Sequence, residues 1–262
     1  MGFEWSPIVQ VGAVFMFMGI GGVHPRFQQS IITRDTFINV VTGAMLFAVR
    51  LSVLYMLAKL SFLEAGAVSL ASITHPAIQF LVAFLALDLC RYLAHRLSHR
   101  VPLLWSFHRV HHSTEMLDPT AGLRMHLVDV LILTAIPLGI YGLLFDVSSF
   151  ASWVVPMALL LGVVFDAYQH SNIAMRMEGG GLGVAINRCW DFILNNPHFH
   201  SWHHTRDGYL RDGNYGNVLT IWDRLLGTCV SGDRPPDELG LPPDQALVDG
   251  VLSMQMLVVR EE

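Results

Sequence analysis

The sequence has little charge and no basic tract. Only 14% of its 262 residues are charged, whereas soluble globular proteins have about a quarter. Hydrophobic residues make up 53%, and the mean hydropathy is +0.47. This balance argues against an ordinary soluble domain and indicates a membrane protein. The formal net charge of −5, without a run of Lys or Arg, gives no indication of nucleic-acid binding.

Motifs of several common classes are also missing. The three cysteines, Cys90, Cys189 and Cys229, are scattered without a CxxC pair, which predicts ordinary thiols rather than a disulfide framework or a zinc knuckle. There is no HExxH, which argues against a zinc protease of the familiar type. There is no GxGxxG, so an oxidoreductase built on this chain would take electrons from another protein. No Lys or Arg precedes the first apolar run, so we expect no secretory signal there.

Apolar runs dominate the first two thirds of the chain. A helix that crosses the hydrocarbon core needs about 20 mostly apolar residues. Five runs approach that length: Ile8–Val23, Phe37–Leu63, Pro76–Cys90, Leu127–Phe145 and Val147–Tyr168. They predict an all-α, integral membrane helical bundle with five crossings and the N-terminus outside. The third run can continue as a helix past the membrane surface, with Pro76 in its first turn. A charge such as Arg50 is costly inside such a span.

Basic residues are placed unevenly. They are concentrated in the 91–125 stretch and after residue 170, whereas the loops near 64–75 and 146 carry none. The positive-inside tendency therefore predicts that both histidine-rich stretches face the cytoplasm. We expect N-terminal transmembrane helices over 1–75, a di-metal domain with a cytoplasmic cap over 76–230, and a C-terminal tail over 231–262.

Histidine is the residue in excess. The chain has 13, and most fall in three short clusters with the spacings HxxxH, HxxHH and HxxHH. In a helix, such spacings bring imidazoles to one face, and imidazole suits iron, copper, zinc and nickel. A single histidine is more often a surface or capping residue, but chance does not repeat this pattern. The clusters are His95 and His99, then His108, His111 and His112, then His200, His203 and His204.

Eight imidazoles are too many for one metal ion. A zinc ion takes four ligands, whereas two metals with five or six ligands each would use eight or more and leave positions for dioxygen. The number of histidines alone does not exclude a pair of copper ions or a pair of zinc ions. A bis-histidine haem would need isolated histidines on facing membrane helices rather than adjacent pairs.

The residues around these clusters carry a family resemblance. Asp88 and Tyr92 precede the first cluster, and Leu104–Ser113 surrounds the second. Pro197 precedes the third cluster, and Asn214-Tyr215-Gly216 and Trp222–Thr228 follow it. Over residues 80–230 the chain resembles the fatty acid hydroxylase/sterol desaturase superfamily of membrane di-iron enzymes. The first two apolar runs share only hydrophobicity with that superfamily.

The resemblance implies a set of iron ligands. The eight clustered histidines would bind two irons, and His170 matches a further ligand position before the last cluster. The implied metal ligands are His95, His99, His108, His111, His112, His170, His200, His203 and His204. Some members of the superfamily have another histidine where this chain has Asp166, so that residue could ligate, orient His170, or do neither.

Three residues are candidates for supporting the ligands: Asp88, His126 and Asp166. Asp88 could accept a hydrogen bond that fixes His95, or be a helix-surface acid. The stretch Arg124-Met125-His126 is similar to an Arg-x-His-Pro stretch of the superfamily, but Leu127 replaces the proline and Asp129 replaces a glutamate. His126 could therefore support the site or be structural. His198 falls at a variable position and is predicted to be a non-ligand.

The resemblance implies an oxidoreductase that hydroxylates or desaturates a C–H bond of a lipid, such as a sterol or a fatty acyl chain. It would use two Fe ions, O2 as co-substrate, a lipid taken from the bilayer, and an external donor such as a ferredoxin or a cytochrome b5-like protein. Two alternatives stay open from the residues: a membrane zinc-dependent hydrolase, and a catalytically inactive metal-binding membrane protein.

Overall fold

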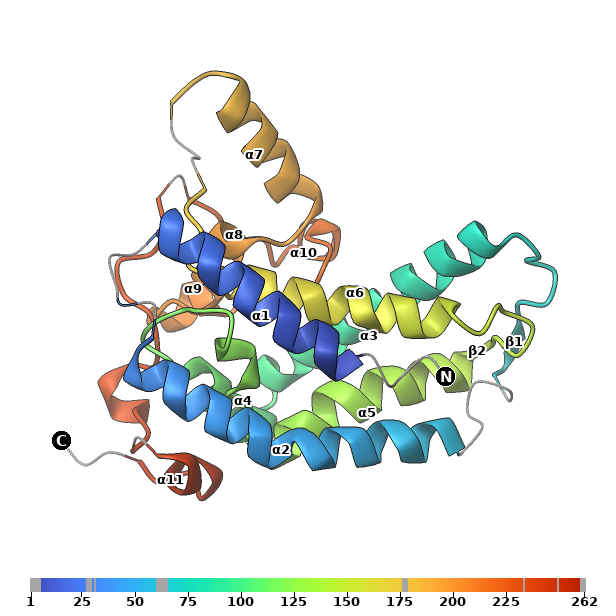
Figure 1. Cartoon of the computed structure of the whole chain (residues 1–262), viewed down its shortest axis with the longest axis horizontal. Helices are drawn as coiled ribbons and strands as arrows, with labels where there is room; N and C mark the ends of the chain where they lie inside the picture. Colours follow the sequence, from blue (N-terminus) through green and yellow to red (C-terminus); the bar gives the residue numbers. More distant parts are fainter. Residues whose placement is uncertain are drawn as a thin grey trace.

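The computed structural model describes residues 6–26, 30, 32–59, 66–175, 179–232, 234–248 and 250–259. It is mostly helical, as predicted, and its long helices form an elongated bundle (Figure 1). These are α1 (Ser6–Val23), α2 (Arg34–Lys59), α3 (Pro76–Arg100), α5 (Leu127–Leu144) and α6 (Val154–Gln169). The end of the second predicted run, residues 60–63, lies outside the described residues.

Three helices in the described part of the chain are long and apolar enough to cross a membrane. They are Arg34–Val53 within α2, Pro76–Arg100 and Leu127–Leu144. The apolar stretches Val9–Val23 and Val154–Gln169 are shorter. The predicted extension of the third run is confirmed, because α3 continues for 25 residues from Pro76 in its first turn. The C-terminal end of this helix therefore carries His95 and His99 beyond the apolar part.

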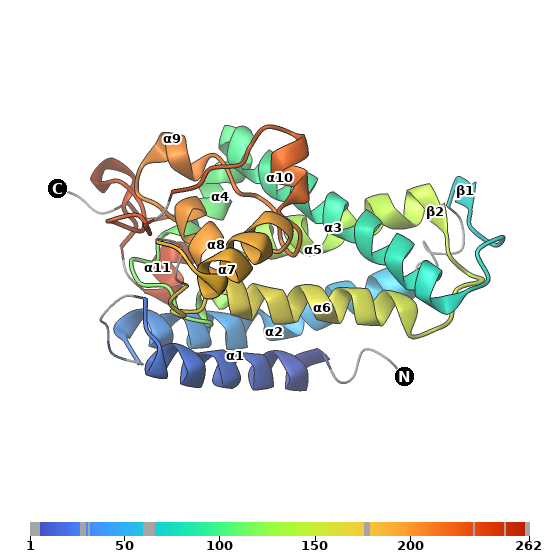
Figure 2. The same ribbon diagram turned by 90° about the horizontal axis from the view of Figure 1, so that it is seen from above.

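The predicted start of the last run was wrong. Residues 147–153 are not helical, and α6 begins only at Val154. The Asp146 carboxylate accepts a hydrogen bond from the Ser148 backbone at 3.0 Å, a local turn that competes with helix formation. The two-residue strand β2 (Phe145–Asp146) pairs in parallel with β1 (Val68–Ser69) at the end of the bundle opposite the short helices (Figure 2).

Helix α3 lies at the centre of the bundle and contacts α4, α5 and α6. Helix α1 packs on α6, and α2 packs on α5. The largest apolar core joins α3, α5 and α6 near the end of the bundle that carries β1 and β2. Its buried members are Ala83, Leu87, Tyr141, Val147, Phe150, Val154, Val155 and Ala158. This core fixes the three helices whose other ends carry polar residues.

Short helices form a cap at the opposite end of the bundle (Figures 1 and 2). Proline begins α4 and α8, where a missing N–H costs nothing. The Asn196 side chain caps α8 by accepting bonds from the His198 and Phe199 backbones, both at 3.0 Å. The short helices are α4 (Pro102–His112), η2 (Ala121–Leu123), α7 (Leu182–Ile193), α8 (Pro197–His203), α9 (Gly208–Arg211), α10 (Ile221–Leu225), η3 (Pro243–Gln245) and α11 (Val251–Gln255).

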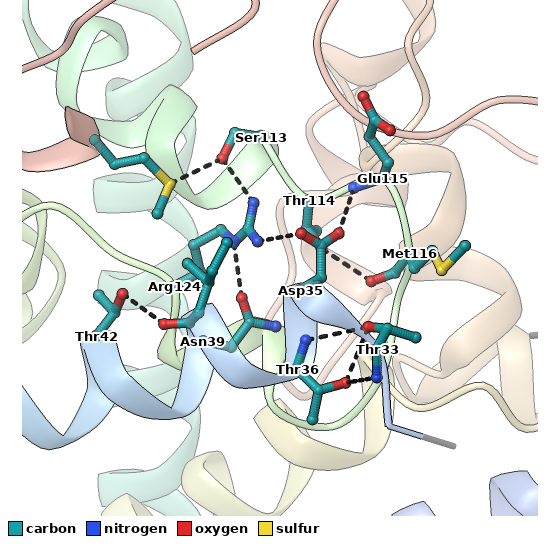
Figure 3. Close-up of polar contacts among 12 residues, drawn as sticks. Thr33, Asp35, Thr36, Asn39, Thr42, Ser113, Thr114, Glu115, Met116 and Arg124 are labelled. Atoms are coloured by element: carbon teal, nitrogen blue, oxygen red, sulfur yellow. Dashed lines mark hydrogen bonds and ion pairs between the residues drawn. The ribbon is translucent and has the colours of Figure 1, made fainter. Parts of the chain in front are cut away.

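A buried polar network joins α2 to the loop that follows α4 (Figure 3). Arg124, which is fully buried, forms an ion pair with Asp35 and donates to Asn39 Oδ1 at 2.7 Å and to Ser113 Oγ at 3.1 Å. Asp35 Oδ2 also accepts from the Thr114 hydroxyl at 3.2 Å. The network therefore fixes α2 against the second histidine cluster.

We expect Arg124→Gln to lower the free energy of unfolding by on the order of 3 kcal/mol, because removing one partner of a buried ion pair leaves the other uncompensated. The measurement is the midpoint of thermal unfolding in detergent. Arg206→Gln is the matched control, since its ion pair with Glu238 at 3.1 Å is partly exposed and worth no more than about 1 kcal/mol. Equal midpoints for the two variants would contradict the structural role of Arg124.

Candidate metal centre

The structure brings together all nine histidines that the sequence singled out as metal ligands. Helix α3 supplies two, α4 three, α6 one at its C-terminal cap, and α8 with its cap three. They form two groups, within each of which one ring nitrogen per residue lies within 4.8 Å of the others. The first group is His95, His99, His108, His112 and His203; the second is His111, His170, His200 and His204.

Ring nitrogens in both groups face one another at short distances. In the first group, the Nε2 atoms of His95 and His108 are 3.1 Å apart. In the second group, His170 Nε2 lies 3.2 Å from His111 Nε2 and 3.0 Å from His200 Nε2. Two nitrogens that bind one metal ion at about 2.1 Å and at right angles lie ~3.0 Å apart. The spacing therefore fits metal coordination.

Backbone carbonyls fix the orientation of two rings in the first group. His95 Nδ1 donates to the Tyr215 carbonyl at 2.9 Å, and His203 Nδ1 donates to the Gly213 carbonyl at 2.7 Å. A carbonyl only accepts, so the proton of each neutral ring is on Nδ1 and the lone pair is on Nε2. Both lone pairs therefore point into the group.

Aspartates hold three further rings, two by the side-chain carboxylate and one by the main-chain carbonyl. His108 Nδ1 lies 2.9 Å from Asp129 Oδ2, and His99 Nδ1 lies 3.4 Å from Asp212 Oδ1. His170 Nδ1 donates to the main-chain carbonyl of Asp166 at 2.7 Å, while the Asp166 carboxylate is farther away, at 3.7 Å. Each contact again directs a proton to Nδ1 and a lone pair to Nε2.

The ring assignments leave several buried lone pairs without a partner among the described residues. With both protons on Nδ1, the Nε2 lone pairs of His95 and His108 face each other with no proton between them. The Nε2 atoms of His99 and His203 and both nitrogens of His112 are buried without a hydrogen-bond partner among the described residues. Such groups are costly when unpaired. The donor set thus fits two metal ions of the kind that imidazole binds.

Burial keeps the rings in the form that a metal requires. Desolvation, helped by the neighbouring imidazoles, lowers the pKa of five histidines of α4, α8 and the α8 cap well below the usual value of 6.5. They are therefore neutral at pH 7, and a metal need not displace protons from them. The five are His111, His112, His200, His203 and His204.

The suggested support of His95 by Asp88 requires correction. The Asp88 carboxylate accepts from the backbones of Val218 and Leu219, both at 3.1 Å, and from Trp222 Nε1 at 2.9 Å. His95 is held instead by the Tyr215 carbonyl. Asp88 therefore acts on the segment after α9 and ties it to α3.

The other two candidates for supporting the ligands also differ in role. His126 Nδ1 caps α5 by accepting from the Val128 backbone at 3.0 Å, and its Nε2 bonds to the Gln255 carbonyl at 2.9 Å. It is structural. Asp166 orients His170, but mainly through its main-chain carbonyl. His198 belongs to neither histidine group in the described part of the chain, and its Nε2 bonds to the Gly232 carbonyl at 2.6 Å.

The residues 213–216 form a part of the site that the sequence did not reveal. Asn214 adopts a left-handed φ of 56°, and its side chain bonds to the Phe199 and Val230 carbonyls at 2.8 and 2.7 Å. A Cβ on Gly213 would lie 2.6 Å from the Thr228 carbonyl oxygen, so this close approach requires glycine. This segment is thus shaped to present two carbonyls to His95 and His203.

A cavity of about 500 Å³ connects the histidines with the interior of the bundle. Five of the nine histidines line it, namely His95, His108, His111, His170 and His200. Farther along, its wall is mostly apolar and comes from α3, α5 and α6, including Leu87, Leu133, Pro137, Leu138, Met157 and Leu160. Such a volume is in the range of small-molecule sites.

A histidine-rich metal centre capping an apolar helical bundle defines a class of membrane metalloprotein. The family model for fatty acid hydroxylases matches residues 80–228, more than half of the chain. The chain belongs to the fatty acid hydroxylase family. Its matched relatives include hydroxylases, monooxygenases and a sterol desaturase. No solved structure matches it.

Several curated proteins are similar to this chain. Alkylglycerol monooxygenase of Danio rerio is 32% identical over 56% of the chain and 29% of its own length. Ornithine lipid hydroxylase OlsE of Rhizobium tropici is 33% identical over 61% of the chain and 44% of its own length. Delta(7)-sterol 5(6)-desaturase of Leptosphaeria maculans is 32% identical over 62% of the chain and 38% of its own length. The chain thus matches less than half the length of each of these relatives.

The contacts of His170 give a test of what orients it. We expect His170→Ala to lose most bound metal, whereas Asp166→Asn should keep a metal content close to wild type, because the main-chain carbonyl that holds the ring is unchanged. The measurement is metal per chain by elemental analysis after iron-replete expression. Loss of metal in Asp166→Asn as severe as in His170→Ala would show that the carboxylate, not the carbonyl, holds the site.

Proposed function

We propose that this protein is a membrane lipid hydroxylase or desaturase that uses two irons, dioxygen and electrons from a separate donor protein. The nine histidines would hold the irons, five in one group and four in the other. The relatives support the reaction class, since their names describe hydroxylation, monooxygenation and desaturation of lipids. The absence of a flavin or nicotinamide motif supports an external donor, such as a ferredoxin or a cytochrome b5-like protein.

The cavity is the observation that carries this proposal. It joins an apolar wall between candidate membrane helices to five of the histidines. A lipid chain lying in it would be shielded from water along its length and would present one part to the metal centre. A site for a water-soluble substrate would not need an apolar passage through the bundle. The cavity therefore favours a substrate drawn from the bilayer.

Two irons, when bound, supply the activation of dioxygen that attack on an unactivated C–H bond requires and that side chains lack. The chain contributes position and environment. The Tyr215 and Gly213 carbonyls hold His95 and His203 with their Nε2 atoms directed inward. The apolar wall aligns the lipid and excludes water from the reacting carbon.

The metal content tests the proposal most directly. We expect about two irons per chain in purified protein and loss of most of that iron in His111→Ala, since His111 Nε2 lies 3.2 Å from His170 Nε2 at the centre of the second group. A His126→Ala variant is the control, because that histidine caps α5, bonds to the Gln255 carbonyl and belongs to neither histidine group. Protein that holds one zinc and no iron after iron-replete expression would contradict the di-iron assignment.

Activity is tested by comparing the lipids of cells that express the wild type with those of cells that express His203→Ala. We expect a hydroxylated or desaturated lipid in the first set only, because His203 belongs to the first group of ligands. Dioxygen uptake by the purified protein with a chemical reductant is the corresponding measurement in vitro. Identical lipids in both sets, together with no dioxygen uptake, would contradict the proposed activity.

We further propose that the cap faces the cytoplasm, which is what the distribution of basic residues favours. Glu115 and Ser231 are both exposed residues of the cap, and Cys189 is an exposed native thiol. Single cysteines at positions 115 and 231 in a Cys189→Ser background should react with an impermeant maleimide only after cells are opened. Labelling of either position in intact cells would contradict this orientation.

A further inference from the structure

The cavity contains three charged side chains that belong to neither histidine group. They are Arg50 of α2, Arg91 of α3 and Asp166 of α6. Arg91 precedes His95 by four residues, and Asp166 precedes His170 by four, so each lies one helical turn from a histidine of the site. Along both helices they fall between the histidines and the apolar wall. Charged groups at such a depth are costly and mark functional positions. We call these three residues the polar collar.

The arginines of the polar collar have hydrogen-bond donors without partners. Within the described part of the chain, the Arg91 guanidinium donates no hydrogen bond. Arg50 Nη2 has only a sulfur contact, 2.9 Å from Met125 Sδ, and a long bond of 3.5 Å to the Gly122 carbonyl. Neither arginine forms an ion pair with Asp166 among the described residues. Each guanidinium has five N–H donors, so most of them are available to a ligand in the cavity.

The backbone makes room for this arrangement at two glycines. A Cβ on Gly162 of α6 would overlap Nη1 of Arg91, and a Cβ on Gly122 would overlap Oδ2 of Asp166. The Arg91 side chain therefore packs directly against the backbone of Gly162, and the Asp166 side chain against that of Gly122. The polar collar therefore depends on facing elements that are shaped to hold it, and is not a chance grouping of charges.

We propose that the polar collar binds the anionic oxygens of a carboxylate or phosphate group of the lipid, so that the substrate is an acidic amphiphile rather than a neutral one. This inference rests on the proposed function, because the lipid is taken to be the molecule that the metal centre oxidises. Two guanidiniums and one carboxylate leave one net positive charge in a largely apolar cavity. Guanidinium matches the geometry of carboxylate and phosphate with paired N–H donors, and a low dielectric strengthens the attraction.

Equilibrium binding tests the inference without turnover. Purified, iron-loaded protein in neutral detergent, without reductant, is titrated with a fatty acid, an alkyl phosphate and a fatty alcohol of the same chain length, each competing with a fluorescent fatty acid. We expect at least one of the two acidic amphiphiles to bind roughly 10-fold more tightly than the alcohol, as for a charge-assisted hydrogen bond. The stronger of the two identifies the group as carboxylate or phosphate.

Variants show whether the polar collar causes this preference. Arg50→Gln and Arg91→Gln should each remove most of it and leave the affinity for the alcohol unchanged. Gly162→Ala should do the same while keeping every charge, because the added methyl displaces the flexible end of Arg91. Arg188→Gln, which removes a charge from the exposed surface of α7, is the matched control and should keep the preference. Iron content and the unfolding midpoint establish that each variant is folded.

Equal affinity of the wild type for acids and alcohol, or a preference that survives in folded Arg50→Gln and Arg91→Gln, would overturn the inference. These outcomes are distinct from failure of the proposed function. Oxidised lipid in cells with no acidic preference in binding would reject the polar collar alone. A preference for acids in a protein that neither takes up dioxygen nor oxidises lipid would reject the proposed function and leave only a binding site.

Discussion

Fixing the Nδ1 proton of five of the nine imidazoles is the constraint on which the site depends. A free histidine exchanges its proton between two nitrogens and rotates about two bonds. Here the carbonyls of Gly213 and Tyr215 and the carboxylate of Asp129 each hold one ring by Nδ1, so that the Nε2 lone pairs converge. Those partners come from segments that only the complete fold brings to the histidines. The folded cap therefore maintains the tautomer and the orientation of these rings.

Local spacing explains how much could be predicted from the sequence. HxxxH and HxxHH specify their own geometry once the segment is a helix, and proline before α4 and α8 marks where those helices begin. The long apolar runs likewise predicted the positions of the long helices, except where the turn at Asp146 delays α6.

The remaining features depend on contacts between distant segments. The carbonyl that holds His95 comes from Tyr215, 120 residues away, and a carbonyl has no signature in a sequence. Asp88 lies about two helical turns before His95, which made it a candidate for fixing that ring, but the segment 218–222 offers its carboxylate three donors. Arg50 appeared only as a costly charge in an apolar run. In the structure it lines the same cavity as Arg91 and Asp166, a placement that the run does not reveal.

Adjacent histidines in the chain are divided between the two histidine groups, and this division links the geometry of one group to that of the other. His111 and His112 are adjacent in α4 but belong to different groups, and so do His203 and His204 at the end of α8. Helices α4 and α8 are therefore shared by both groups. A displacement of either helix moves ring nitrogens of both groups at once, so neither group can be reshaped without changing the other.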